Sequence, residues 1–409
     1  MKNVVVLGAG TAGTMITRKL VSKLDPNYWK VTLVDKDEQH YYQPGFLFLP
    51  FKLYGEKDVR RPKRNFIPSA VNFVLSDIEV IEPDANKVKL TNGTVLDYDI
   101  LVVATGCDIN PGETEGLLGD GWRNNIFDFY TYDGAKALGD HLANWQGGRF
   151  VVNVVENPIK CPVAPLELLF LADWWFTKKG MRDKVDLTYA TPLSGAFTKP
   201  RASKALGDIL AKKNIHIEPD YNIGSVDAGK NLIKSWDDRE VGYDLLVSVP
   251  TNMGSEVIER SGMGDDLNFV PVDKHTLQSD KWENVFVLGD ANNIPISKAG
   301  AVVHFQMESA FKNIIDYAVG KKPTHQFDGH ASCYIESGFE KAVLIDFNYD
   351  IEPLPGKYPV PGIGPFTLLG ESTVNHWGKL GFKTLYWDVM MRGIEVPLPS
   401  KFSMAGKSA

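Results

Sequence analysis

This chain of 409 residues has few cysteines, no net positive charge and no long apolar run. The three cysteines are Cys107, Cys161 and Cys333, and no CxxC pair or Cys/His cluster accompanies them, which argues against zinc, c-type haem and a thioredoxin-like dithiol. We therefore expect no metal. The net charge of −7 argues against a nucleic-acid partner, which would select a basic surface. No apolar run approaches 18 residues, so a membrane-spanning helix is not expected.

The composition is typical of a globular protein with more than one domain. Hydrophobic residues make up 44% of the chain and charged residues 23%, as in ordinary folded proteins. A chain of 409 residues exceeds one ordinary core, which predicts two or three domains. The opening MKNVVVLGAG lacks the charged, apolar and cleavage regions of a secretory signal, so we expect synthesis without an export signal.

The first residues place a glycine-rich turn between an apolar strand and a helix. The run NVVVL (3–7) precedes Gly8-Ala-Gly10-Thr-Ala-Gly13, and a helical stretch follows. Gly8 permits a tight turn, Gly10 lets the backbone approach a pyrophosphate, and Gly13 allows close packing of helix on strand. The phosphates would then lie at the helix N-terminus. The next strand ends in Asp35, 22 residues after Gly13, where a carboxylate can accept a hydrogen bond from a ribose hydroxyl.

Two later strands indicate which dinucleotide is bound. DYDILVVATGCD (97–108) ends in an Ala-Thr-Gly turn, and WENVFVLGDANN (282–293) ends in Gly289-Asp290. Both segments resemble signatures that recur in flavoproteins with two dinucleotide-binding domains. Either turn alone is ordinary turn chemistry, but together with the first glycine turn they predict FAD. We expect the chain to leave the FAD domain near residue 108 and to return near residue 276.

The inserted segment lacks the second glycine turn that an NADH-binding domain needs. Its first strand, GRFVVNVV (148–155), leads into Cys161-Pro-Val-Ala-Pro-Leu-Glu167 and a long helix, and the strand at 184–192 ends without an acidic residue. We infer that this domain keeps the fold but has lost nicotinamide binding. Because Cys161 precedes a helix and Lys160 adjoins it, the pKa of this thiol is expected to be low. The alternative is that Cys161 only packs at the turn.

At these positions the chain resembles the sulfide:quinone oxidoreductases, along nearly its whole length. The family segment C-P-x-A-P-x-E corresponds to Cys161 through Glu167, and a second family cysteine corresponds to Cys333 in ASCYIESGFEKAVLIDF. YQPGF (42–46) is similar to the family's turn over the flavin, and Lys298 lies in the stretch that is similar to the family's segment beside the flavin ring. The resemblance implies FAD bound by a set of residues from both segments: Gly8, Gly10, Ala12, Gly13, Asp35, Lys36, Gln43, Ile78, Thr105, Gly106, Gly289, Asp290, Lys298 and Gly300.

The predicted architecture is an α/β protein with two Rossmann-like dinucleotide-binding domains and a C-terminal region. The FAD domain is discontinuous, with residues 1–108 as its first part and 276–325 as its second. Residues 109–275 form the second Rossmann-like domain without the NADH glycine loop. Residues 326–409 form a region for contact with quinone and membrane, with an amphipathic helix as the anchor.

The resemblance implies a sulfur relay. Hydrosulfide attacks a disulfide or polysulfide bridge between Cys161 and Cys333, which gives a persulfide and a thiolate assigned to Cys333. Two electrons pass to FAD and on to a membrane quinone, and the product is polysulfide or sulfur. Glu167 is the candidate acid/base, although it can equally be a structural carboxylate. Many family members carry a third redox cysteine in the loop that corresponds to residues 124–135, where Tyr130 or a neighbour takes its place here, and we assign Cys107 a structural role.

The C-terminal region carries a basic, amphipathic stretch with aromatic residues at Trp377, Tyr386 and Trp387. Such a helix either packs on its own protein or a dimer partner, or lies on a membrane surface. The resemblance favours monotopic attachment at the cytoplasmic face, a homo-oligomer, and a quinone slot near Pro44, Tyr334 and Phe366. The apolar residues recur on one helical face, at Phe382, Leu385, Tyr386, Val389 and Met390.

Three other functions share part of this pattern. A type II NADH:quinone oxidoreductase has the same fold, but the missing glycine turn counts against it. A flavocytochrome-type sulfide dehydrogenase shares the cysteines but works outside the cytoplasm. A non-enzymatic FAD-binding redox sensor would bind FAD without turning over quinone.

Overall fold

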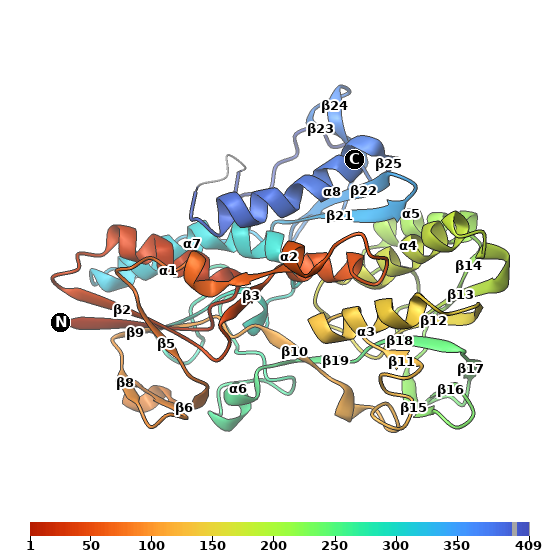
Figure 1. Ribbon diagram of the computed structural model, residues 1–409. Coiled ribbons are helices and arrows are strands. Elements are labelled where there is room, and N and C mark those ends of the chain that lie inside the picture. The colour runs from red at the N-terminus through yellow and green to blue at the C-terminus, as the bar shows by residue number, and fades with distance from the viewer. Residues whose placement is uncertain (395–398, 409) are drawn as a thin grey trace.

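The computed structural model describes residues 1–394 and 399–408, which form three units (Figure 1). Two units are built on parallel sheets and lie next to each other. The third unit, drawn in blue, is formed by the C-terminal part of the chain and lies across the other two. The predicted α/β fold is thereby confirmed.

The first sheet contains five parallel strands that come from two separate segments of the chain. The apolar runs of its other four strands are buried, as expected where helices cover a parallel sheet, while β5 at the sheet edge is partly exposed. β20 follows the second domain in sequence yet pairs with β9, so a late segment completes a sheet that the first residues begin. The strands in spatial order are β20 (Val285–Val287), β9 (Ile100–Val103), β1 (Lys2–Leu7), β2 (Trp29–Asp35) and β5 (Asn72–Leu75).

Helices and small antiparallel elements surround this sheet. α1 (Thr11–Lys23) packs against α7 (Gly300–Ala318), which joins the two segments a second time. The smaller elements are β3 (Gln39–Tyr41), η1 (Gln43–Phe48), α2 (Glu56–Val59), β4 (Arg60–Pro62), β6 (Ile78–Glu82), β7 (Lys87–Leu90) and β8 (Val95–Asp97).

We predicted that the chain returns to the FAD domain near residue 276. Residues before this position already contact the first domain. α6 (Glu256–Arg260) packs on β6, and the Arg260 guanidinium donates to the carbonyl of Glu79 at 3.1 Å. The hydroxyl of Ser261 accepts from the Ile81 N–H at 2.9 Å. Residues 256–261 of the predicted second domain therefore contact the first domain, and the boundary near residue 276 stays a prediction.

The second domain has its own five-stranded parallel sheet, reached and left through an antiparallel pair of connecting strands. The connecting strands are β10 (Cys107–Asn110) and β19 (Thr251–Gly254). The sheet order is β11 (Ile126–Phe127), β18 (Leu245–Val249), β12 (Gly148–Val154), β13 (Val185–Ala190) and β14 (Ile215–Glu218). The remaining elements are α3 (Tyr132–Leu142), α4 (Ala164–Lys178), α5 (Pro200–Lys212), β15 (Ile223–Asp227), β16 (Leu232–Ser235) and β17 (Glu240–Gly242).

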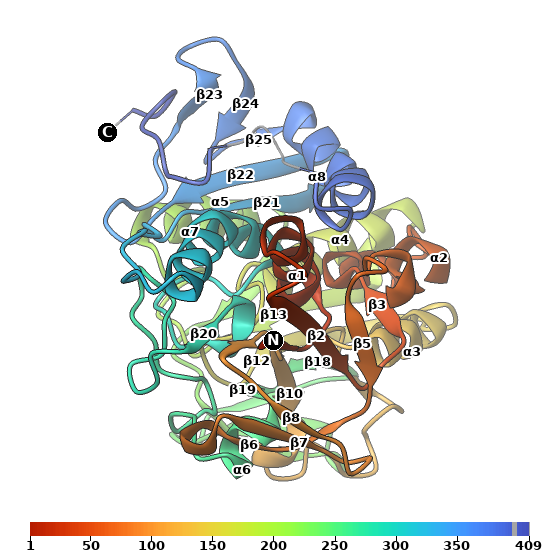
Figure 2. The same cartoon turned by 90° about the vertical axis from the view of Figure 1, so that its left-hand side faces the viewer.

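The C-terminal unit is a small sheet held between helices. One end strand, β21, contacts α4 and α7 of the domains beneath it, while α8 packs on β22 and β21 (Figure 2). Its elements are β21 (Ala331–Gly338), β22 (Lys341–Phe347), β23 (Gly356–Val360), β24 (Gly364–Leu368), β25 (Glu371–Ser372), α8 (Thr373–Leu385) and the π-helical turn η7 (Tyr386–Met390).

The amphipathic pattern of the C-terminal stretch reflects packing within the protein. Of the three aromatic residues that we assigned to a membrane interface, Tyr386 and Trp387 are buried, so the assignment is wrong for these two. The helix begins at Thr373, capped by the Ser372 hydroxyl, which accepts from the Asn375 N–H. Tyr386 and Trp387 are fully buried because the π-helical turn packs against the first domain. In the part of the chain that the structure describes, no helix is long and apolar enough to span a membrane.

Trp387 should therefore be a major source of stability. Its indole stacks on Phe66 at 5.4 Å between centroids, and its N–H donates to the Asp58 carbonyl at 2.9 Å. We expect Trp387→Ala to lower the free energy of unfolding in urea by about 3–5 kcal/mol, since a large cavity opens. Trp377→Ala, at a side chain that is 64% exposed, is the matched control and should cost less than about 0.5 kcal/mol. Equal losses would contradict this account.

Candidate active site

The glycine turn after β1 has the shape that a dinucleotide requires. Gly8 has φ of +93°, and a Cβ there would lie 2.4 Å from the Ala104 carbonyl oxygen. A Cβ on Gly13 would lie 1.7 Å from the Gly8 carbonyl oxygen, so only glycine lets α1 approach this closely. Gly10, by contrast, has no protein atom within 4 Å of the Cβ position, which leaves open space at the N-terminus of α1. A pyrophosphate fits this arrangement.

Asp35 lies beside this turn, at the end of β2. Its carboxylate accepts the Ala9 N–H at 2.6 Å and pairs with the buried Lys63 at 2.5 Å. The predicted ribose contact thus falls on a carboxylate that also fixes the turn. The neighbouring Lys36 is exposed, and Ile78 is buried at the start of β6, just past β5.

The late segment brings its own predicted residues to the same edge of the sheet. A Cβ on Gly289 would lie 3.2 Å from the Ala12 methyl group, so the GD turn and the first glycine turn are neighbours. Thr105 and Gly106 form the turn after β9, which pairs with β20. Thr105 Oγ1 is buried without a hydrogen-bond partner among the described residues, as a position waiting for a bound group would be.

The half-buried Asp290 and the buried Lys298 lie near each other at this edge. Burial raises the pKa of the Asp290 carboxyl, against the opposing charges of Lys298 and Lys160. The Lys298 ammonium donates to the carbonyls of Asp290 and Asn292, at 3.0 and 2.6 Å. Gly300 then opens α7, with free space at its Cβ position. The first glycine turn, the turn after β9 and the turn at Gly289 together fit a dinucleotide that carries a ring system.

The Cys161 turn is joined directly to this FAD-side segment. The Cys161 N–H donates to the Lys298 carbonyl at 2.7 Å, although the two residues belong to different domains. Tyr130 lies against the turn, with its hydroxyl donating to the Cys161 carbonyl at 3.3 Å. Cys161 has φ of +44°, a region that residues other than glycine rarely adopt. Such strain persists only where surrounding contacts hold it in place.

Cys333 reaches the same place from the C-terminal unit. It lies in β21, which packs on α4, the helix that begins three residues after Cys161. Both thiols are free and half-buried, and they are near enough for their charges to interact. Cys107 is more fully buried, in β10, and faces Asp290, Lys160 and Lys298.

The expected low pKa of Cys161 is wrong. Burial raises the pKa of the Cys161 thiol well above its usual range and that of Cys333 to about 12. The N–H of Ala164, where the helix starts, does favour the Cys161 thiolate, but burial of the thiol outweighs this effect. Lys160 acts on Asp290 and Cys107, and the cation that favours a thiolate at Cys161 is Lys379.

Glu167 is paired with that same lysine. Its Oε1 accepts from the Lys379 ammonium at 2.7 Å and from the Glu336 N–H at 2.7 Å. Burial raises the pKa of the Glu167 carboxyl, and Lys379 opposes the rise. The sequence did not reveal Lys379, because it lies 212 positions away and we counted it among the basic residues of a surface helix.

A second set of contacts that the sequence missed lies behind the glycine turn. The Tyr386 hydroxyl forms hydrogen bonds to Thr11 Oγ1 at 2.7 Å and to His40 Nε2 at 2.6 Å. His40 Nδ1 lies 3.2 Å from the Ala9 carbonyl oxygen. Burial, reinforced by Lys63, lowers the pKa of His40 to about 4, so the ring is neutral. The C-terminal segment therefore supports the FAD turn.

The residues predicted for quinone are only partly brought together. The rings of Tyr334 and Phe366 lie 5.9 Å apart, and Tyr334 directly follows Cys333. Pro44 lies in η1, beside the exposed Gln43, and η1 packs against α2, α3 and α4.

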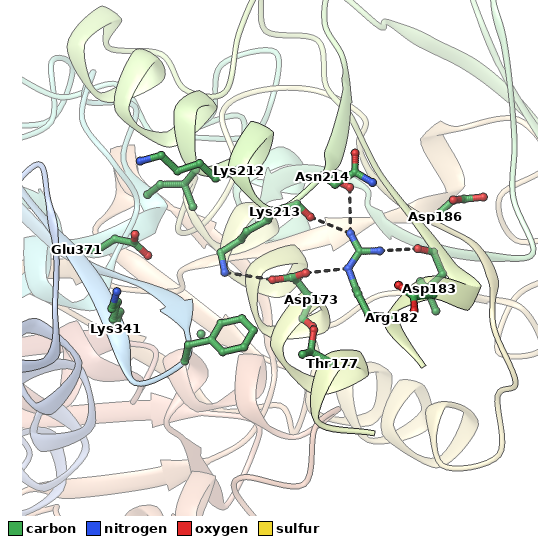
Figure 3. A pocket seen from close by; sticks show the side chains of 14 residues that line it. Asp173, Thr177, Arg182, Asp183, Asp186, Lys212, Lys213, Asn214, Lys341 and Glu371 are labelled. Atoms are coloured by element: carbon green, nitrogen blue, oxygen red, sulfur yellow. Dashed lines mark hydrogen bonds and ion pairs between the residues drawn. The ribbon is translucent and has the colours of Figure 1, made fainter. Parts of the chain in front are cut away.

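An open pocket of about 680 Å³ lies away from the thiols, at the far end of α4 (Figure 3). Its walls are charged, and Arg182 joins them by donating to Asp173 at 2.8 Å and to the Lys213 carbonyl at 2.9 Å. Asp173 also pairs with the Lys213 ammonium at 3.2 Å. Because these groups bind one another, the pocket is an ion-paired junction between helices, distinct from the thiol site.

Fold and site together define an FAD-binding α/β oxidoreductase. Residues 2–152 match the family described as "Pyridine nucleotide-disulphide oxidoreductase". The chain is 30% identical over 402 residues to the mitochondrial sulfide:quinone oxidoreductase of Dictyostelium discoideum, covering 96% of this chain and 87% of that protein. It therefore belongs to the sulfide:quinone oxidoreductase family.

Two further comparisons agree with this assignment. The mitochondrial sulfide:quinone oxidoreductase of Mus musculus is 26% identical over 400 residues, covering 95% of this chain and 86% of that protein. The solved sulfide:quinone oxidoreductase of Aquifex aeolicus has a TM-score of 0.82 at 21% identity, covering 96% and 92% of the two chains. The family, the enzyme class and the FAD cofactor predicted from the sequence are confirmed.

The support that Tyr386 gives to the glycine turn can be measured through FAD affinity. We expect Tyr386→Phe to weaken FAD binding about fivefold, since the lost hydrogen bonds are worth roughly 1 kcal/mol. Titration of the apoprotein with FAD, followed by flavin fluorescence, gives the affinity. Tyr28→Phe, at an exposed tyrosine, should leave it unchanged. An unaltered affinity in Tyr386→Phe would show that the network does not serve the FAD site.

Proposed function

We propose that sulfide oxidation in this protein runs through Cys161 and Cys333, with FAD accepting the electrons. The observation that carries this proposal is the hydrogen bond from the Cys161 N–H to the Lys298 carbonyl. This bond supports the proposal because it joins the Cys161 turn to Lys298, in the segment that is similar to the family's stretch beside the flavin ring. Cys333, in β21, lies near enough to Cys161 for the two thiols to interact.

The proposed chemistry begins with a sulfur bridge between the two cysteines. Hydrosulfide forms a bond to Cys161 as the bridge to Cys333 breaks, so Cys161 becomes a persulfide and Cys333 leaves as a thiolate. When the persulfide loses its proton and its outer sulfur bonds to Cys333, two electrons are released. FAD supplies a two-electron acceptor when bound. Each cycle adds one sulfur atom to the bridge, which accounts for a polysulfide product.

Glu167 is the proposed acceptor of the persulfide proton. Its carboxyl is buried beside Cys161, and burial raises its pKa, which makes the carboxylate a better proton acceptor. The proposed FAD contacts are the fourteen predicted residues. The clearest support is the open space beside Gly10 and Gly300 and the unpaired, buried hydroxyl oxygen of Thr105 among the described residues.

The electrons are proposed to leave through a quinone near Tyr334 and Phe366. These rings form an apolar pair directly beyond Cys333. Pro44 remains a prediction, as do the homo-oligomer and the cytoplasmic face of the membrane.

We propose that the C-terminal unit rests on a membrane surface, through Trp377 of the original pattern together with exposed residues outside it. Seven of the fifteen large apolar side chains that are exposed among the described residues lie in this last fifth of the chain. Trp377 and Leu380 lie on the outer face of α8, and Val360 and Ile363 lie at the tip of the β23–β24 hairpin, which projects from the molecule (Figure 1). Exposed aromatic and aliphatic groups on one unit favour interfacial binding.

The sulfur relay is tested by mixing sulfide with the purified holoenzyme under anaerobic conditions. We expect the oxidised flavin absorbance to disappear and to return when a quinone is added. Cys333→Ser should keep FAD but lose flavin reduction by at least a hundredfold, because no thiolate can form the second bond to sulfur. Cys107→Ser is the matched control and should retain reduction. A Cys333→Ser variant that still bleaches quickly would contradict the proposed role.

Membrane attachment is tested by sedimentation with phosphatidylcholine–phosphatidylglycerol vesicles. The double variant Trp377→Ser, Ile363→Ser should reduce the bound fraction at least tenfold, since burial of these side chains in lipid is lost. Trp236→Ser, at a tryptophan 79% exposed on the second domain, should bind as the unmodified chain does. Equal loss in both variants, or in neither, would count against the C-terminal surface.

A further inference from the structure

The open edge of β21, next to both thiols, is closed by one ion pair. β21 is an end strand of its sheet, so its outward backbone groups have no strand partner there. Glu167 Oε1 accepts the Glu336 N–H at 2.7 Å, and the Lys379 ammonium donates to the Tyr334 carbonyl at 3.0 Å. Lys379 and Glu167 also pair with each other at 2.7 Å. A helix of the C-terminal unit is thereby fastened to α4 across the strand that carries Cys333.

This pair is deeply buried. The side chain of Glu167 is 1% exposed and that of Lys379 is 11% exposed. Replacing such a pair by apolar residues is often neutral or favourable for stability, so burial of two charges beside a reactive group calls for a functional reason. The ammonium is bound to the backbone of Tyr334, the residue that follows Cys333, and this contact fixes its position relative to the thiol.

We propose that Lys379 is a positioning residue that stabilises the thiolate which Cys333 becomes when it leaves the sulfur bridge. The inference rests on the proposed function, which requires Cys333 to be the leaving sulfur. Without a nearby cation, the buried site would favour the neutral thiol and oppose the departure of Cys333.

The charges around Cys333 support this assignment. Lys379 from α8 lowers the pKa of the Cys333 thiol, whereas Glu167 from α4 and Asp346 from β22 raise it. Asp346 is itself paired with Lys407 at 2.6 Å and with His330 at 2.8 Å, so its effect is partly neutralised. Cys161 lies nearby and responds to the same lysine. Lys379 is the cation that acts on Cys333 in the described part of the chain.

An electrostatic role and a purely mechanical one give opposite expectations for the two members of the pair. If the pair only closes the strand edge, Lys379→Met and Glu167→Gln disturb Cys333 in the same direction. If charge matters, Lys379→Met raises the pKa of Cys333 and Glu167→Gln lowers it. Combining the two substitutions should then return the value toward that of the unmodified enzyme, since both charges are gone.

The experiment follows alkylation of Cys333 by iodoacetamide in FAD-loaded enzyme reduced with dithiothreitol, with each cysteine peptide quantified by mass spectrometry. Rates are measured across pH, so that the midpoint reports the pKa separately from access. We expect Lys379→Met to slow alkylation about tenfold at pH 8, the change that one pKa unit produces, and Lys379→Arg to restore it. Glu167→Gln should speed it, and the double variant should lie between.

Lys383→Met is the matched control, because Lys383 lies one turn further along α8 and pairs with Asp58 instead. Its alkylation profile should not move. Shifts of Cys333 in one direction for both single variants, or no shift in either, would overturn the proposal. The measurement uses no sulfide, so a failure here is distinct from a failure of sulfide to reduce the flavin, which would overturn the relay itself. FAD content and thermal unfolding of each variant confirm that the fold is kept.

Discussion

The backbone hydrogen bond between Cys161 and Lys298 is the contact on which the arrangement of the site depends. It joins the Cys161 turn of the second domain to the late segment of the FAD domain. These segments are far apart in sequence, and the late one is held in the first sheet because β20 pairs with β9. Both partners are backbone atoms, so neither side chain supplies the bond itself. The thiol, the strained turn and the start of α4 are all positioned from it.

The site combines a dry environment with few compensating charges. Burial disfavours thiolates at both cysteines, and the same burial keeps carboxyls such as Glu167 and Asp290 closer to neutrality. Water exclusion protects reactive sulfur species from side reactions, at the cost of stabilising anions poorly. The two buried lysines, Lys298 on the flavin side and Lys379 on the strand side, oppose this effect from two directions.

Local patterns in the sequence were sufficient for the elements and for the cofactor. The Gly8 turn, the buried strands and Pro165 in the first turn of α4 all follow from neighbours within a few residues. The contacts of Lys379 and Tyr386 join residues hundreds of positions apart, and no local spacing encodes them. The amphipathic stretch near Trp387 was ambiguous in principle, because a helix facing its own core and a helix facing lipid have the same periodicity.

The contacts of Tyr386 also bear on how the holoenzyme assembles. The wall behind the FAD turn is completed by a residue from nearly the other end of the chain, through Thr11 and His40. During synthesis, the glycine turn emerges first and stays without this support until the C-terminal unit has folded. A chain that ends before Tyr386 lacks both hydrogen bonds behind the turn, and we expect it to retain FAD less well than the full chain.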